Sequence, residues 1–171
     1  MPPAQDETVN RSDGVRVREY DAGKDERSLR ECIVELQDFE RALIPALPEG
    51  VMMADGYLAE LIADCARSKG AILVADAGTS LVGFVCVLAA VQQEELDEPP
   101  GAYAYISDLM VRSTHRRRGL GEALLRRALA FATSAGATSI KIGVLSKNLE
   151  AQRLYERVGF TPYRVELSRT L

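Results

Sequence analysis

Apolar and polar residues alternate, or apolar residues form short runs, in several segments of the chain. Segments of this kind are typical of β-strands. The predicted strands are residues 15–20, 71–76, 81–88, 103–112, 139–145 and 163–167. The second and third flank a turn around Gly78, which predicts an antiparallel hairpin.

Elsewhere apolar residues recur at helical spacing. One stripe begins after Asp25 and includes Leu29 and Phe39, a second fits residues 57–69, and a third follows residues 120–135. Gly136 supplies a stop for the third helix, and the prolines of 43–50 mark a loop between the first two.

The order β-α-α-β-β-β-α-β-α-β predicts an α/β fold with a mixed, mostly antiparallel sheet and helices on both faces. Residues 1–13 are polar, contain prolines and lack periodicity, so we expect a flexible N-terminal tail there. The remaining residues, 14–171, are expected to form a single domain, since 171 residues with 47% hydrophobic content suit one packed core.

Charge and cysteine content narrow the classes of function. A formal net charge of −4 argues against general nucleic-acid binding. Cys32, Cys65 and Cys86 are odd in number and widely spaced among apolar residues, which predicts buried thiols in a reducing compartment, with no metal or disulfide pattern. No apolar run reaches membrane-spanning length and the first residues lack a basic signal-peptide start, so we expect a cytoplasmic protein without membrane partners.

The sequence His-Arg-Arg-Arg-Gly-Leu-Gly-Glu at 115–122 lies between a predicted strand and a predicted helix. Free N–H groups and the positive dipole end of a helix start can hold an anion. Gly119 and Gly121 lack the Cβ that would keep a phosphate from this backbone, and the arginines at 116–118 add bidentate donors. The segment predicts a diphosphate site; the alternative is a basic turn that caps a helix.

The segment departs from two common phosphate loops. A Walker loop has Lys-Ser/Thr after its last glycine, where Glu122-Ala123 stands here, and a dinucleotide fingerprint needs a third glycine. Arg116-x-x-Gly119-x-Gly121 instead resembles the acetyl-CoA diphosphate loop of the GCN5-related N-acetyltransferases (GNATs). Residues 148–160 resemble the second signature of that family, Asn-x-x-Ala-x-x-Leu-Tyr-x-x-x-Gly-Phe, at every fixed position. The chain is therefore identified as a member of the family.

The resemblance implies an N-acetyltransferase that moves an acetyl group from acetyl-CoA, as co-substrate, to a primary amine by direct attack in a ternary complex, without a metal. It implies the GNAT fold, in which the strands on either side of the diphosphate-loop helix splay apart to form the acetyl-CoA cleft. The cofactor-binding residues it implies are the backbone of Leu109, Met110 and Val111, the loop residues Arg116, Arg117, Arg118, Gly119, Leu120, Gly121 and Glu122, and Asn148 and Tyr155. Asn148 has a second interpretation, as a helix N-cap alone.

Acetyl transfer to an amine needs a neutral amine and a protonated leaving thiolate. Tyr155 matches the tyrosine that donates this proton, and its ordinary pKa of about 10 keeps it protonated at neutral pH; alternatively it only packs. Asp108 is the candidate general base, with Asp38, Glu40 or a chain of waters as alternatives. His115 is interpreted as structural or as a phosphate neighbour.

The acceptor is expected to be a small-molecule amine or the amine of a protein or peptide. Acids at 94–98 favour a cationic amine, or serve as solubilising charge. A homodimer through the C-terminal strand at 163–167 or through the helical face is expected by analogy with the family. Three alternatives remain: a CoA-binding regulatory module without turnover, an enzyme using another acyl chain or acceptor, and a nucleic-acid binder, for which residues 112–127 lack stacking aromatics near the arginines.

Overall fold

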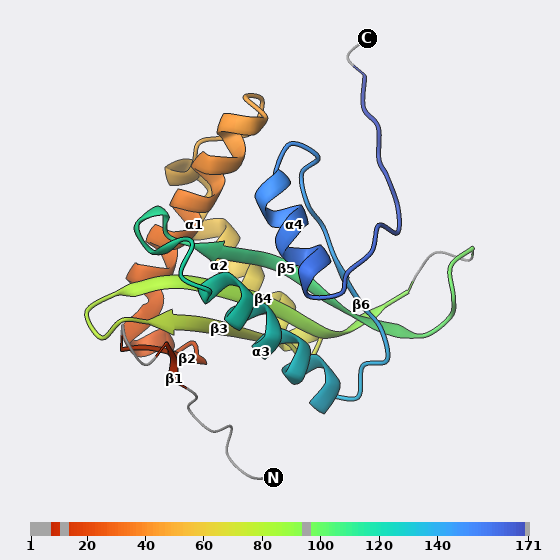
Figure 1. The fold of residues 1–171 in the computed structure, drawn as a ribbon, viewed down its shortest axis with the longest axis horizontal. Helices are drawn as coiled ribbons and strands as arrows, with labels where there is room; N and C mark the ends of the chain where they lie inside the picture. The colour runs from red at the N-terminus through yellow and green to blue at the C-terminus, as the bar shows by residue number, and fades with distance from the viewer. Residues whose placement is uncertain (1–7, 11–13, 94–96, 170–171) are drawn as a thin grey trace.

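The computed structural model describes residues 8–10, 14–93 and 97–169, and in this part of the chain six strands form one open sheet (Figure 1). The strands lie in chain order and are β1 (Thr8–Asn10), β2 (Val15–Glu19), β3 (Ala71–Asp76), β4 (Leu81–Gln92), β5 (Ala102–Val111) and β6 (Ile140–Ile142). All neighbours are antiparallel except β5 and β6, which are parallel. The predicted mixed, mostly antiparallel sheet is confirmed.

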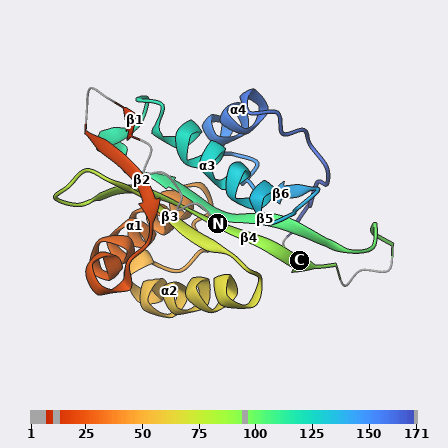
Figure 2. The same cartoon turned by 90° about the horizontal axis from the view of Figure 1, so that it is seen from below.

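Helices cover both faces of the sheet, as the sequence predicts (Figure 2). They are α1 (Ala22–Leu43), α2 (Gly50–Arg67), α3 (Leu120–Ser134) and α4 (Leu149–Arg157), with a short 3-10 helix η1 (Ser113–His115). One buried cluster joins α1 and α2 to the sheet and another joins α3 and α4 to its opposite face. Strand β4 is buried on both faces from Leu81 to Ala89, which explains its nearly continuous apolar sequence.

Helix α2 begins at Gly50, earlier than the predicted start at Tyr57. The Asp38 carboxylate accepts the Gly50 N–H at 2.9 Å and so satisfies a free donor at the start of the helix. A Cβ on Gly50 would lie 2.6 Å from the carbonyl oxygen of Val34, so glycine allows the close approach of α2 to α1. These two contacts hold the start of α2 against α1.

Strands β5 and β6 separate soon after they meet. They pair only at Ala104–Ile106, opposite Ile140–Ile142. On the other side of β5, Cys86 lies opposite Asp108 but Val87 lies opposite Ile106, so Ser107 is the extra residue of a β-bulge. The predicted strand at 139–145 is therefore wrong beyond Ile142, because β5 changes register there. On the side of β5 that faces β6, residues 107–111 have no strand partner, although they pair with β4 on the other side. The predicted splay between β5 and β6 is therefore present.

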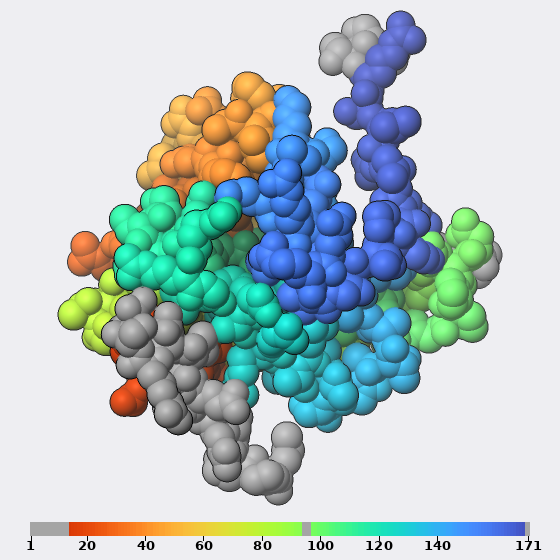
Figure 3. Space-filling view, viewed as in Figure 1, coloured from red at the N-terminus to blue at the C-terminus, as the bar shows by residue number. Residues whose placement is uncertain are grey.

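The two ends of the described chain differ from the sequence prediction. Thr8–Asn10, expected in a loose tail, form β1 and pair with β2; residues 1–7 and 11–13 lie outside the described residues. The predicted strand at 163–167 is wrong, because this segment has no strand beside it in the described part of the chain. Its Tyr163 and Arg164 side chains bind the Glu98 carboxylate instead. The segment stands away from the body of the molecule (Figure 3).

Among the described residues, no helix has the length and apolar character needed to cross a membrane.

Candidate functional site

The loop before α3 presents backbone N–H groups at a helix start. Arg117 and Gly119 both have left-handed backbone, with φ of 63° and 80°. Left-handed residues between right-handed or extended ones turn successive N–H groups toward one side and form a concavity suited to an anion. Gly119 is the N-cap of α3 and no side chain caps the helix there. The first three N–H groups of α3 have no intrahelical acceptor, so this loop suits a diphosphate.

The two glycines of the loop have different roles. A Cβ on Gly119 would meet no atom within 4 Å, whereas a Cβ on Gly121 would lie 3.2 Å from Cδ2 of Leu154 and 3.8 Å from Cγ2 of Val111. The absent Cβ of Gly121 therefore makes room for α4, and its role in admitting a phosphate stays a prediction. Gly119 is the glycine whose freedom the loop uses, since its positive φ disfavours other residues.

The three predicted arginines also divide by role. The Nε of Arg116 donates to the Val111 carbonyl at 3.0 Å, and its guanidinium carbon lies 4.9 Å from the centre of the Phe39 ring. Arg116 thus ties the loop to β5 and to α1. Arg117 is exposed and pairs with Glu150 of α4 at 3.1 Å, and the exposed Arg118 donates to the Thr114 carbonyl at 3.4 Å. Arg117 and Arg118 supply the outward positive charge of the loop.

Asp108 is a buried acid beside the point where β5 and β6 separate. It is 7% exposed, and its Oδ1 accepts a hydrogen bond from the Tyr57 hydroxyl at 2.9 Å. Its Oδ2 is buried without a hydrogen-bond partner in the described part of the chain. Burial raises the pKa of Asp108, and the hydroxyls of the neighbouring Ser107 and of Tyr57 oppose that rise. A desolvated carboxylate with one open oxygen is a competent proton acceptor.

Tyr57 was not singled out from the sequence. Its position on α2 turns it toward the sheet, where burial and the adjacent Asp108 charge raise its pKa, so it stays a hydrogen-bond donor. Its partner is 51 residues away in the chain. No short-range pattern could have identified this pair.

Tyr155 of α4 is buried and packs in the cluster under α3 and α4. Its ring centre lies 6.1 Å from that of Phe160. Burial, with the charges of Glu40 and Asp108, raises the pKa of Tyr155 to about 12. The packing role is therefore confirmed, and proton donation stays a prediction, which the raised pKa favours because the hydroxyl remains protonated.

Asp108 and Tyr155 lie on opposite faces of the sheet, at the opening between β5 and β6. Asp108 bonds to α2, on the face that α1 and α2 cover, and Tyr155 belongs to the cluster on the face that α3 and α4 cover. Tyr105 lies at the same opening, since its hydroxyl is 3.1 Å from the place of a Cβ on Gly143, just after β6. The charge of Asp108, after burial and the charge of Glu40, contributes to the raised pKa of Tyr155.

Three further predicted residues border the opening. Asn148 is the N-cap of α4, and its side chain accepts the Ala151 N–H at 3.2 Å, so the capping interpretation is confirmed. Met110 is buried toward α1 and α2, while Leu109 is half-buried on the opposite face. Both residues pair with β4, and neither is paired with β6 on the other side of β5.

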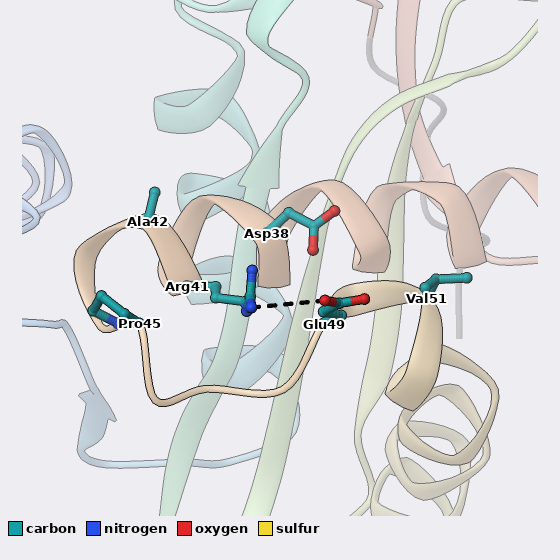
Figure 4. Close-up of a pocket in the computed structure, with 6 residues that line it drawn as sticks. All are labelled: Asp38, Arg41, Ala42, Pro45, Glu49 and Val51. Carbon is teal, nitrogen blue, oxygen red and sulfur yellow. Dashed lines mark ion pairs between the residues drawn. The ribbon is translucent and has the colours of Figure 1, made fainter.

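A cavity of about 390 Å³ lies at the junction of α1 and α2 (Figure 4). It is lined by Asp38, Arg41, Ala42, Pro45, Glu49 and Val51, and Arg41 pairs with Glu49 across it at 3.7 Å. Neither Asp108 nor Tyr155 lines it. Asp38, an alternative base, is engaged as the cap of α2, whereas burial, together with the Asp108 charge, raises the pKa of the half-buried Glu40. Glu40 is therefore the acid of this helix end that adds negative charge near the opening.

The family model of the acetyltransferase (GNAT) family matches residues 36–160, which include α1 from its middle, the loop before α3 and all of α4. The chain belongs to the GNAT family. The match ends at Phe160, the last residue of the second signature.

Named relatives agree with this assignment. A mycothiol acetyltransferase of Thermobispora bispora is 31% identical over 155 residues, which are 91% of this chain and 49% of the relative. The thialysine N-epsilon-acetyltransferase of Mus musculus is 26% identical over 152 residues, 83% of this chain and 79% of the relative. This chain thus spans about half the length of the first of these relatives, and most of the second.

Solved structures share the fold. The structure of AAC(6')-Iy in complex with a bisubstrate analogue of CoA and acetylneamine has a TM-score of 0.66 at 17% identity and covers 92% of this chain and 98% of that one. At this identity the likeness shows the fold alone. Among the residues that the structure describes, no group of three or more His, Cys, Asp or Glu side chains could hold a metal ion.

Proposed function

We propose that the chain is an acetyl-CoA-dependent N-acetyltransferase that moves an acetyl group to a primary amine by direct attack in a ternary complex. The observation that carries the proposal is Asp108, a buried carboxylate with one open oxygen at the opening between β5 and β6. The family and the names of the relatives support acetyl transfer.

The residues present suit acetyl-CoA as co-substrate. The backbone N–H groups of Gly119–Glu122 suit its diphosphate, since a helix start without a side-chain cap attracts an anion, and Arg117 and Arg118 add positive charge. The pantetheine amides would pair with the free edge of β5. The carbonyl of Val111 already accepts a bond from Arg116, and the carbonyl of Met110 faces Gly83 of β4, which leaves Leu109 as the main edge residue.

In the proposed reaction, the amine nitrogen forms a bond to the acetyl carbon and the carbon–sulfur bond breaks. Asp108 takes the proton that the amine loses, since its carboxylate is desolvated and its Oδ2 is open. Tyr155 gives a proton to the departing sulfur, since its pKa of about 12 keeps the hydroxyl protonated. The two residues act from opposite faces of the opening, so acceptor and acetyl-CoA enter from different sides.

The proposed acceptor is a small-molecule amine that carries positive charge. Asp108 and the half-buried Glu40 place two carboxylates on the acceptor side, and burial raises the pKa of each. A cationic group on the acceptor would compensate both negative charges, because buried carboxylates are poorly solvated by water. The names of two relatives fit this class, since one acts on thialysine and AAC(6')-Iy is an aminoglycoside N-acetyltransferase.

Turnover of acetyl-CoA over a panel of amines, with mass analysis of the products, tests the proposal. The panel would include polyamines, aminoglycosides, lysine analogues, a lysine peptide and a cysteinyl amine, with Asp108→Asn as the matched control. We expect an N-acetylated product from at least one cationic small amine and its loss in the control. Binding of CoA without any acetylated product would contradict catalysis and favour a regulatory module.

A further inference from the structure

Two of the three cysteines lie in contact. Cys65 is in the last turns of α2 and Cys86 is in β4, and their Sγ atoms are 3.6 Å apart. Cys86 is fully buried, whereas Cys65 is only partly buried. The third thiol, Cys32, lies elsewhere, with its Sγ 3.8 Å from the Leu81 carbonyl oxygen. The contact joins a helix to a strand, so a bond between the sulfurs would cross-link two elements of the core.

The backbones beside this pair are already fixed together. The Ser68 carbonyl, just after α2, accepts the N–H groups of Ala89 and Ala90 of β4 at 3.0 and 2.8 Å. A Cβ on Gly70 would lie 2.6 Å from the Val87 carbonyl oxygen and 3.0 Å from Cα of Cys65. Since a disulfide needs its sulfurs at about 2.05 Å, closure needs a movement of about 1.5 Å, within reach of side-chain rotation and a small shift of α2.

The two thiols differ in reactivity. Either sulfur can donate the bond between them; with Cys86 as the donor, the bond lowers the pKa of Cys65, and the same bond, together with burial, raises the pKa of Cys86. The thiolate is the form that reacts with oxidants, and access matters as well. Cys65, the more exposed thiol, is therefore the one that reacts first, and Cys86 is placed to resolve the product.

We propose that Cys65 and Cys86 form a reversible disulfide when the protein meets hydrogen peroxide. The Cys65 thiolate attacks one peroxide oxygen, the O–O bond breaks, and the leaving hydroxide takes a proton to become water, which leaves a sulfenic acid on Cys65. The Cys86 sulfur then attacks the Cys65 sulfur, and hydroxide leaves with the Cys86 proton as a second water. Two thiols lose two electrons in all, and the peroxide gains them. A dithiol reductant reverses the step.

The disulfide also changes the candidate site, a consequence that rests on the proposed function. Cys86 lies opposite Asp108 in the pairing of β4 with β5, and α2 carries both Cys65 and Tyr57, the donor to Asp108. Drawing α2 toward β4 changes the geometry of the Tyr57–Asp108 bond. We expect kcat/KM for the acceptor amine to fall, while the loop before α3, on the opposite face, still binds CoA.

Hydrogen peroxide treatment of the native protein, followed by peptide mapping without reductant, tests the disulfide. We expect the thiols titrated after denaturation to fall from three to one, the mass to fall by about 2 Da, and the peptides of Cys65 and Cys86 to be joined. The melting temperature should rise by roughly 5–10 °C and return with dithiothreitol. The Cys65→Ser variant should keep both remaining thiols, and Cys32→Ser should cross-link like the parent.

Three retained thiols, a bridge through Cys32, or sulfinic acid on Cys65 with Cys86 still reduced would overturn the proposal. For the coupling to the site, we expect kcat/KM for the acceptor to fall about fivefold or more on cross-linking, with the Kd for CoA unchanged. Full cross-linking without a change in kcat/KM would overturn the coupling. Full cross-linking in a protein that binds CoA but acetylates no amine would support the disulfide and contradict the proposed function.

Discussion

The Tyr57 hydroxyl donates a 2.9 Å hydrogen bond to Oδ1 of Asp108 and leaves Oδ2 of that buried carboxylate without a partner among the described residues. The bond joins α2 to β5 at the residue that follows the Ser107 bulge. It fixes the carboxyl plane while the second oxygen keeps a free lone pair. Tyr57 is in this account a positioning residue for the base.

The Tyr57→Phe variant tests this role by the pH dependence of kcat/KM. Burial raises the pKa of Asp108 and the Tyr57 bond lowers it, so removing the bond raises the pKa further. Because the base acts when deprotonated, we expect the acidic limb of the profile to move to higher pH. The loss of a donor to a buried carboxylate should also cost about 1–3 kcal/mol of stability at neutral pH.

Tyr20→Phe is the matched control for this substitution. The Tyr20 hydroxyl is also buried near α1 and α2, but it has no hydrogen-bond partner in the part of the chain that the structure describes. We expect neither a shift of the pH profile nor a loss of stability. An acidic limb that stays in place in Tyr57→Phe would contradict the positioning role.

Asp108→Asn separates a catalytic from a structural role. Folding raises the pKa of Asp108, so ionisation of Asp108 favours the unfolded state. The resulting loss of folding stability is fully present at a pH above the folded-state pKa. It vanishes at a pH below the unfolded-state pKa. We expect kcat/KM to fall about a hundredfold or more. In urea unfolding, we expect the free energy of unfolding of the variant to exceed that of the parent most at neutral pH. This difference should become smaller as the pH falls. Normal turnover in a destabilised variant would mark Asp108 as structural.

Gly119→Asp against Gly119→Asn tests the diphosphate site. Both side chains have the same size and tolerate the left-handed backbone of Gly119, and neither meets an atom within 4 Å at its Cβ. Only the aspartate adds negative charge at the helix start. We expect calorimetry to give a Kd for CoA about tenfold or more weaker for the aspartate than for the asparagine variant. Equal affinities would show that the diphosphate does not bind at this loop.

The sequence predicted the parts of the molecule that depend on local pattern. The loop of Gly119 and the cap at Asn148 follow from short-range spacing, and both lie where the pattern places them. The strand at 163–167 was predicted from alternation alone, but alternation gives no information on whether a partner strand exists. The early start of α2 at Gly50 depends on Asp38 of another helix, which local pattern does not show.

Long-range contacts explain what the sequence left open at the site. Asp108 was one of several candidate acids, and only the fold distinguishes it, because it alone among them is buried with an open oxygen. Arg116 and Gly121 are in the signature, yet their contacts with Phe39 and Leu154 give them packing roles that the signature does not reveal.

The C-terminal segment carries a prediction on assembly. Tyr163, Val165 and Leu167 are 65%, 77% and 91% exposed, and they alternate with polar residues as in a strand. Unpaired strand-like segments favour pairing with a second chain, and we therefore predict a homodimer. Light scattering should give about twice the chain mass of 18.7 kDa, and the Val165→Lys, Leu167→Lys double variant should give the monomer. A monomer mass for the parent at micromolar concentration would contradict the prediction.

Turnover of Tyr155→Phe at saturating acetyl-CoA and amine tests most directly whether the opening between β5 and β6 is the reaction centre. The substitution removes one oxygen and keeps the ring that packs near Phe160, so the melting temperature should change little. Loss of proton donation to the departing sulfur should lower kcat about a hundredfold or more, with KM for acetyl-CoA nearly unchanged. A kcat within about threefold of the parent at saturating substrates would contradict the account.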